Sequence, residues 1–126
     1  MATYTKYNVF VEDMWNKIHD LFGTNDTLNI ALSNTAPVVD TDKIRANITE
    51  LSSANGYTQD THDTANDSTR TTTTVTMTGV DVVITASGAV GPFRYAILYN
   101  TTATSAAGAD PLICFWDYAS SPSLAS

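Results

Sequence analysis

FRYAILYN (residues 93–100) and LICFWDY (residues 112–118) are two strongly apolar stretches separated by a short loop of small and polar residues. Aromatic and β-branched side chains recur along both stretches, as is typical of β-strands. Both faces of each strand are mostly apolar, which indicates burial on two sides. The two stretches therefore predict a hairpin in the middle of a β-sandwich or barrel, not at its edge.

The composition sets limits on the size and partners of the protein. A chain of 126 residues is the size of one domain, here residues 1–126. Charged residues make up 15%, below the roughly one quarter of ordinary soluble domains, and the net charge is −7. An acidic chain with scattered basic residues argues against nucleic-acid binding through the phosphate backbone. No apolar run approaches the length of a membrane span.

Residues 4–22 carry a helical pattern of apolar side chains, and Gly23 is placed to end the helix. The expected amphipathic helix has two interpretations. It packs against the domain's own sheet, or it is an arm that docks on a neighbouring subunit. Its apolar residues, spaced by three and four, are Tyr7, Phe10, Val11, Met14, Trp15, Ile18 and Leu21.

The middle of the chain predicts a β-domain over about residues 27–119. A strand with one solvated face is expected at 27–33, a loop at 34–41, and a short helix entering a strand at 42–51. Residues 58–70 contain scarcely an apolar side chain and predict a projecting or mobile loop. Strands are expected at 71–77 and 80–85, with a break at Gly79. Since no βαβ alternation appears, the fold class is mainly β (α+β), an antiparallel β-sandwich or jelly-roll-like barrel with one N-terminal helix.

Few residues suggest catalysis or cofactor binding. His19 reads as a surface or boundary residue, and His62 as part of a solvated loop, where Asp60, Asp63 and Asp67 lack the spacing of a calcium loop. A metal-dependent or hydrolytic enzyme would depend on that His62 cluster alone. Cys114, the only cysteine, is expected to be a packed thiol. The sequence predicts a non-enzymatic protein without catalytic residues, metal or cofactor.

Seven aromatic side chains in apolar segments are expected to pack in the core, although exposed rings can also stack on sugars. They are Trp15, Phe93, Tyr95, Tyr99, Phe115, Trp116 and Tyr118. Tyr4 and Tyr57 lie in less apolar settings and are candidates to face a partner.

GPFRYAILYN (91–100) followed by DPLICFWDY (110–118) resembles small structural proteins from the virion-assembly regions of tailed bacteriophages. The opening helical segment, LSNTAP (32–37) and NGYT (55–58) resemble the same class. The resemblance implies a capsid decoration (cement) protein, made in the host cytoplasm, which binds the outer capsid surface between major capsid protein subunits as a dimer or trimer. It also implies a further strand after Ser126. The alternative is a tail-associated or receptor- or glycan-binding module of the virion.

With that resemblance, the residues expected to contact a partner are aromatic side chains of the N-terminal segment and of the NGYT turn. They are Tyr4, Tyr7, Phe10, Trp15 and Tyr57.

Overall fold

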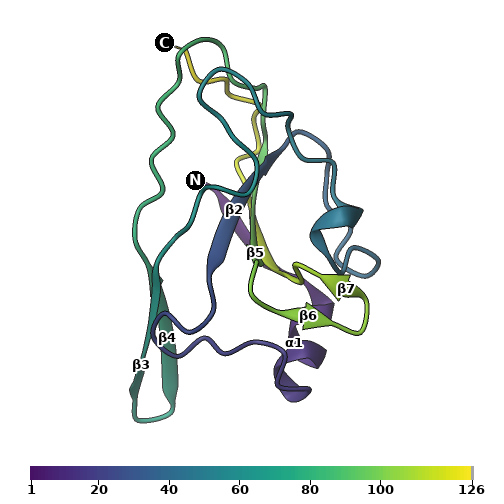
Figure 1. Cartoon of the computed structure of the whole chain (residues 1–126), viewed down its shortest axis with the longest axis vertical. Coiled ribbons are helices and arrows are strands. Elements are labelled where there is room, and N and C mark those ends of the chain that lie inside the picture. The colour runs from purple at the N-terminus through teal and green to yellow at the C-terminus, as the bar shows by residue number, and fades with distance from the viewer. Residues whose placement is uncertain (126) are drawn as a thin grey trace.

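The computed structural model describes residues 1–125, and its centre is one antiparallel sheet of four strands (Figure 1). The strand order is β1 (Thr3–Lys6), β8 (Leu112–Asp117), β5 (Tyr95–Asn100) and β2 (Leu28–Ser33). The two apolar stretches form the central pair, and β5 is buried along its whole length. The predicted central hairpin is therefore confirmed, and the fold is mainly β.

Apolar side chains cover both faces of this sheet. Tyr7, Ile97 and Phe115 belong to the core of one face, against which Val39 and Ile48 pack. The other face has a cluster of buried hydrophobic side chains at each end. Phe10 and Leu21 pack on one cluster, and residues from 84–93 and Leu124 pack on the other. Irregular chain thus supplies much of the cover that a second sheet provides in a β-sandwich.

The remaining elements are short. They are α1 (Asn8–Trp15), the 3₁₀ turn η1 (Arg45–Asn47), the hairpin of β3 (Asn66–Thr71) and β4 (Thr74–Gly79), and the hairpin of β6 (Thr104–Ser105) and β7 (Gly108–Ala109). Residues 1–125 form no second large sheet facing the first, as a sandwich or jelly-roll-like barrel would require. None of the helices in this part of the chain is long and apolar enough to span a membrane.

The predicted helix over 4–22 is wrong at both ends. The first part is strand β1, which pairs with β8 from Thr3 to Lys6, and the Tyr7 N–H continues the ladder to the Ile113 carbonyl. The helix ends at Trp15 because Lys17 takes a left-handed φ of 57°, well before Gly23. Of the two interpretations, packing against the chain's own sheet is the one the structure shows, with Tyr7 and Val9 in the core.

Strand β2 has no solvated face, contrary to prediction, because Asn29, Ala31 and Ser33 are buried. Its outer edge is also covered. The Ile30 N–H donates to the His62 carbonyl, the Thr64 N–H to the Leu28 carbonyl, and the Leu51 N–H to the Leu32 carbonyl. Segment 42–51, predicted as a short helix entering a strand, contains only one short 3₁₀ turn (Arg45–Asn47) and extended chain, and forms no strand.

The predicted projecting loop at 58–70 is replaced by a projecting hairpin, β3–β4 (Figure 1). Residues 62–64 lie against β2, whereas every residue of β4 is exposed. Residues 80–85, expected to be a strand, run as an extended segment without a paired strand. Residues 80–85 form the strap.

The β3–β4 hairpin is almost entirely exposed, which predicts a small contribution to the stability of the domain. We expect that replacing residues 67–78 with Asn-Gly, which suits a two-residue β-turn between the paired residues Asn66 and Gly79, shifts Tm by no more than about 2 °C. The reason is that Asn66, which is kept, is the only buried residue of the two strands. Thermal unfolding followed by circular dichroism, at a chain concentration low enough that the single chain alone is measured, tests this, and a loss of about 10 °C would show that the hairpin supports the core.

Candidate partner-binding surface

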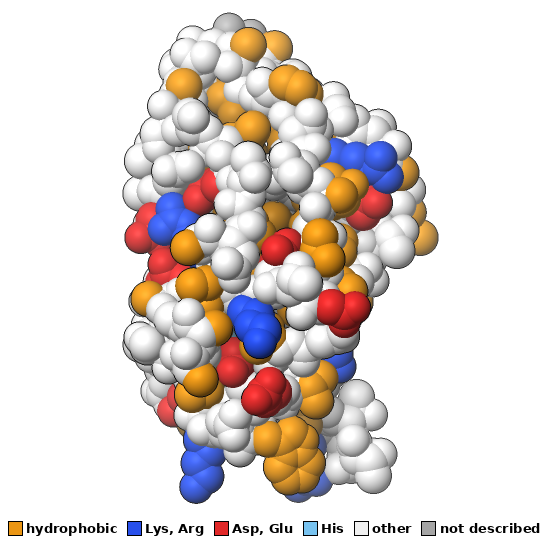
Figure 2. Space-filling view, turned by 90° about the vertical axis from the view of Figure 1, so that its right-hand side faces the viewer, with side chains coloured by type: hydrophobic (Ala, Val, Ile, Leu, Met, Phe, Trp, Pro, Cys, Tyr) orange, Lys and Arg blue, Asp and Glu red, His pale blue; other side chains and the backbone are white. Residues whose placement is uncertain are grey.

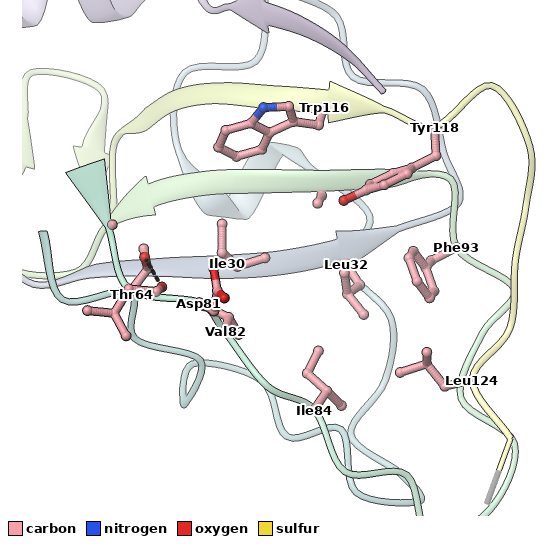
Figure 3. A pocket seen from close by; sticks show the side chains of 13 residues that line it. Ile30, Leu32, Thr64, Asp81, Val82, Ile84, Phe93, Trp116, Tyr118 and Leu124 are labelled. Atoms are coloured by element: carbon pink, nitrogen blue, oxygen red, sulfur yellow. Dashed lines mark hydrogen bonds between the residues drawn. The ribbon is translucent and has the colours of Figure 1, made fainter. Parts of the chain in front are cut away.

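An open apolar groove of about 560 Å³ lies between the central sheet and the strap (Figure 3). Its floor is the sheet face carrying Ile30, Leu32, Ala96 and Trp116. The strap forms one wall with Val80, Asp81, Val82 and Ile84, and the far end is closed by Phe93, Tyr118 and Leu124. A volume of this size and a lining made mainly of hydrophobic and aromatic side chains are typical of binding sites.

The groove exists because the strap, within residues 1–125, makes hydrogen bonds to the rest of the chain only near its ends. At one end the Val80 N–H donates to the Ala65 carbonyl and the Val80 carbonyl accepts from Thr64 Oγ1. At the other end the Ser87 N–H donates to the Asn55 carbonyl. The strap alternates half-buried and exposed residues, so that Val83 is 80% exposed. It therefore bridges the sheet face without filling the space over Ile30 and Trp116.

Strand β1 forms the uncovered edge of the sheet, next to the groove face. Since the Tyr7 N–H bonds to β8, alternation along the ladder turns the backbone N–H and C=O of Tyr4 and Lys6 away from β8. No hydrogen bond within residues 1–125 satisfies these outward groups. The Tyr4 side chain is 56% exposed, and its ring lies 6.0 Å from that of Trp116. This edge can accept another strand.

The outer side of α1 adds exposed apolar area. Val11, Met14 and Trp15 lie at spacings of three and four, with Trp15 84% exposed. Hydrophobic side chains are exposed at several places on the face in Figure 2, with acidic and basic groups scattered between them and no continuous basic patch. The visible surface suits protein contacts better than a polyanion.

The five predicted contact residues differ in how much of each side chain is exposed. Tyr4 and Trp15 are exposed and Phe10 is half-buried, whereas Tyr7 is 0% and Tyr57 1% exposed. The last two are structural, so naming them as contact residues was wrong. Tyr57 was misjudged because its polar sequence neighbours gave no sign of the sheet edge against which it packs.

The core role expected for the seven aromatic side chains in apolar segments is confirmed for Tyr95, Tyr99 and Phe115. It is wrong for Trp15 and Tyr118, which are exposed, and incomplete for Phe93 and Trp116, which line the groove. The sequence showed the apolar alternation of residues 80–85, but not that this segment lacks a paired strand. The groove could not be predicted for that reason.

Tyr57 belongs to a polar network that anchors residues 45–60 to the sheet. Its hydroxyl donates to Glu50 Oε1 at 2.6 Å and accepts from the Leu32 N–H at 3.0 Å. Glu50 Oε2 accepts from Arg45 Nε at 2.9 Å, and the Arg45 guanidinium lies over the Tyr99 ring. Burial, followed by the hydrogen bond to Glu50, raises the pKa of Tyr57, so the hydroxyl stays protonated. This network is satisfied internally and has a structural role.

His62 stacks on Tyr57, with 5.0 Å between ring centroids, and is half-buried. Burial lowers the pKa of His62 below its ordinary value. Within residues 1–125 no three His, Cys, Asp or Glu side chains are arranged to hold a metal ion. The side chain helps to pack Tyr57 at the edge of β2.

His19 is buried, contrary to the prediction of a surface or boundary position. Asn100 Nδ2 donates to His19 Nδ1 at 3.0 Å and to Asp26 Oδ2 at 2.6 Å. Since an amide nitrogen only donates, the neutral imidazole carries its proton on Nε2, which faces Asp13 Oδ2 at 3.9 Å. Burial lowers the pKa of His19 and raises the pKa of Asp13.

We expect the free energy of unfolding to fall as the pH is lowered from 7 to about 5.5. The lowered pKa values of His19 and His62 in the folded state mean that the unfolded chain binds more protons below the ordinary value of about 6.5, and His19 is the more deeply buried of the two. Chemical unfolding at several pH values measures the slope, which should become shallower in His19→Gln. An unchanged slope would contradict the assignment. Asp13 acts in the opposite direction at lower pH, because its raised pKa favours the protonated folded form.

Cys114 is 2% exposed, and burial raises the pKa of its thiol to about 12. The thiolate needed for metal binding or nucleophilic attack is therefore disfavoured. The prediction of a packed thiol is confirmed.

Comparison of the chain with protein-family models, with curated proteins and with solved structures finds no match.

Proposed function

We propose that this protein is a non-enzymatic structural component of a tailed-phage virion, a decoration (cement) protein that binds the outer capsid surface between major capsid protein subunits. The resemblance of the strand motifs suggested this class. The observation that carries the proposal is the unpaired edge of β1, flanked by the exposed rings of Tyr4 and Trp15. An open edge with aromatic flanks suits attachment to an extended segment of another protein.

In this proposal an extended segment of the major capsid protein adds to β1. The added segment forms hydrogen bonds with the outward backbone groups of Tyr4 and Lys6. The side chains of Tyr4, Phe10 and Trp15 contact capsid protein residues next to that segment. Binding to the folded chain alone stabilises both partners by mass action. The sandwich or jelly-roll-like arrangement expected from the sequence is then a property of the assembly, with neighbouring chains supplying the second layer.

A proline at position 6 tests the edge directly. Lys6→Pro removes an N–H that points away from β8, so we expect capsid affinity to fall at least about tenfold while the isolated chain keeps Tm within about 3 °C. Lys6→Ala keeps the N–H and serves as the matched control for loss of the charge. Co-sedimentation with undecorated capsids measures the affinity. Equal binding by the proline and alanine variants would rule out strand addition at β1.

The copy number of the protein in purified virions tests the function itself. Quantitative mass spectrometry against the major capsid protein should give a ratio near one, or a simple fraction such as one third. A handful of copies per particle would place the protein at the tail or portal, and its absence from the particle would refute any virion role.

The alternative, a tail-associated receptor- or glycan-binding module, is supported by the aromatic lining of the groove. Trp116, Phe93 and Tyr118 line the groove, and Asp81 supplies a carboxylate elsewhere along its wall. Glycan binding that is lost in Trp116→Ala, together with a low copy number, would favour this alternative.

A further inference from the structure

The β3–β4 hairpin has two chemically different faces. The register pairs Arg70 with Val75 and Ser68 with Met77, so these four side chains share one face. The other face carries Asp67 and a set of threonines, Thr69, Thr71, Thr74, Thr76 and Thr78. Val75 is 68% and Met77 37% exposed. A two-stranded hairpin with exposed apolar residues is marginally stable alone and gains from a surface to pack against.

The groove is the complementary surface. Most of its lining side chains are apolar, Thr64, Asp81 and the Tyr118 hydroxyl contribute polar groups, and its floor over Ile30 and Trp116 is open. The Asp81 carboxylate is exposed and makes no ion pair within residues 1–125. Arg70 is likewise exposed and bonds only to the Thr72 carbonyl in the same part of the chain. The apolar face of the hairpin thus carries one cation, and the groove one anion.

The hairpin cannot enter the groove of its own chain. Gly79 and Val80, where β4 leads into the strap, already form part of the groove lining, and the two strands extend away from it (Figure 1). The groove of a second copy has no such restriction. Hairpin and groove adjoin along the strap, so two copies in opposite orientation can each supply one and receive the other.

The geometry points to a reciprocal dimer in which the β3–β4 hairpin of each copy lies in the groove of the other. Val75 and Met77 cover Ile30 and Trp116 of the second copy, and Arg70 lies beside its Asp81. The two hairpin strands then form a layer over the four-stranded sheet. This interface uses none of the β1 residues assigned to capsid attachment, so either proposal can fail without the other.

Charge exchange tests the contact. Arg70→Asp and Asp81→Arg each place like charges together in a homodimer, and we expect each to weaken dimerisation at least about tenfold. A 1:1 mixture of the two variants pairs opposite charges at both contacts and should restore the dimer. So should the double variant Arg70→Asp/Asp81→Arg. Both positions are exposed, and circular dichroism verifies folding of each variant.

Light scattering coupled to size-exclusion chromatography, up to about 100 µM chain, reads out the result. The unchanged protein should have twice the 13.5 kDa chain mass, and each single variant should approach the mass of one chain. A monomeric unchanged protein, or a variant mixture that fails to associate, would overturn the proposal.

The two faces of β4 provide a second test with a matched control. Val75→Thr keeps the shape and strand preference of the side chain but adds a hydroxyl to the apolar face, so dimerisation should weaken. Thr76→Val makes the reverse change on the threonine face and should leave the dissociation constant within about twofold. Equal effects of the two substitutions would exclude a contact through the Val75 face.

Discussion

Asn100→Leu is expected to lower the free energy of unfolding by about 3 to 5 kcal/mol. The Asn100 side chain is fully buried and donates to Asp26 and His19. Its Oδ1 accepts from the N–H groups of Thr102 and Ala103, at 2.9 and 3.1 Å. Leucine fills a similar volume but satisfies none of these groups, and each buried polar group left without a partner costs about 1 to 3 kcal/mol. Urea unfolding measures the loss.

Asn29→Leu is the matched control. Asn29 is also buried, on the adjacent strand β2, but its amide makes a single side-chain hydrogen bond, to Asp60 at 3.2 Å. The expected loss is about 1 kcal/mol. If the two leucine variants unfold at the same urea concentration, the network around Asn100 does not contribute as the geometry indicates.

The second large effect is expected for Tyr57→Phe, at about 2 to 3 kcal/mol. The change leaves the Leu32 N–H without its acceptor at the edge of β2 and removes one donor from Glu50. Tyr95→Phe is the control, because the Tyr95 hydroxyl makes no hydrogen bond within residues 1–125, and its loss should change stability by less than about 0.5 kcal/mol.

Equilibrium unfolding of the two phenylalanine variants decides the role of Tyr57. A side chain that served mainly as a partner contact would show little difference from Tyr95→Phe in the isolated chain. Affinity for a partner should be unaffected by Tyr57→Phe, since the side chain is 1% exposed.

The sequence predicted the centre of the fold because local information was sufficient there. In 93–100 and 112–118, strand preference, apolar density on both faces and a short connection all indicated the same hairpin. The prediction for the N-terminal segment was wrong because Tyr4, Tyr7 and Phe10 also fit a helical spacing of three. Pairing with β8, more than 100 residues later in the sequence, nevertheless made its first part a strand.

The candidate site was less predictable than the fold because it depends on contacts between distant segments. His19 is buried by Asn100 and Asp26, and Tyr57 by the edge of β2, and neither set of partners leaves a local pattern. The apolar alternation of 80–85 predicted a strand, whereas the segment is extended but pairs with no strand within residues 1–125. Whether this segment pairs with another strand depends on tertiary contacts, which the local sequence does not show. The groove forms because residues 80–85 remain unpaired.

The cover over the outer edge of β2 has a consequence for solubility at high concentration. A sheet with two open edges can add molecules at both sides and grow into a fibre, as in cross-β aggregation. Here His62, Thr64, Leu51 and the Tyr57 hydroxyl occupy the backbone groups of β2, which leaves β1 as the open edge. Addition of a strand at β1 therefore stops after one partner. A protein made in many copies can keep an unpaired edge strand without polymerising through its sheet.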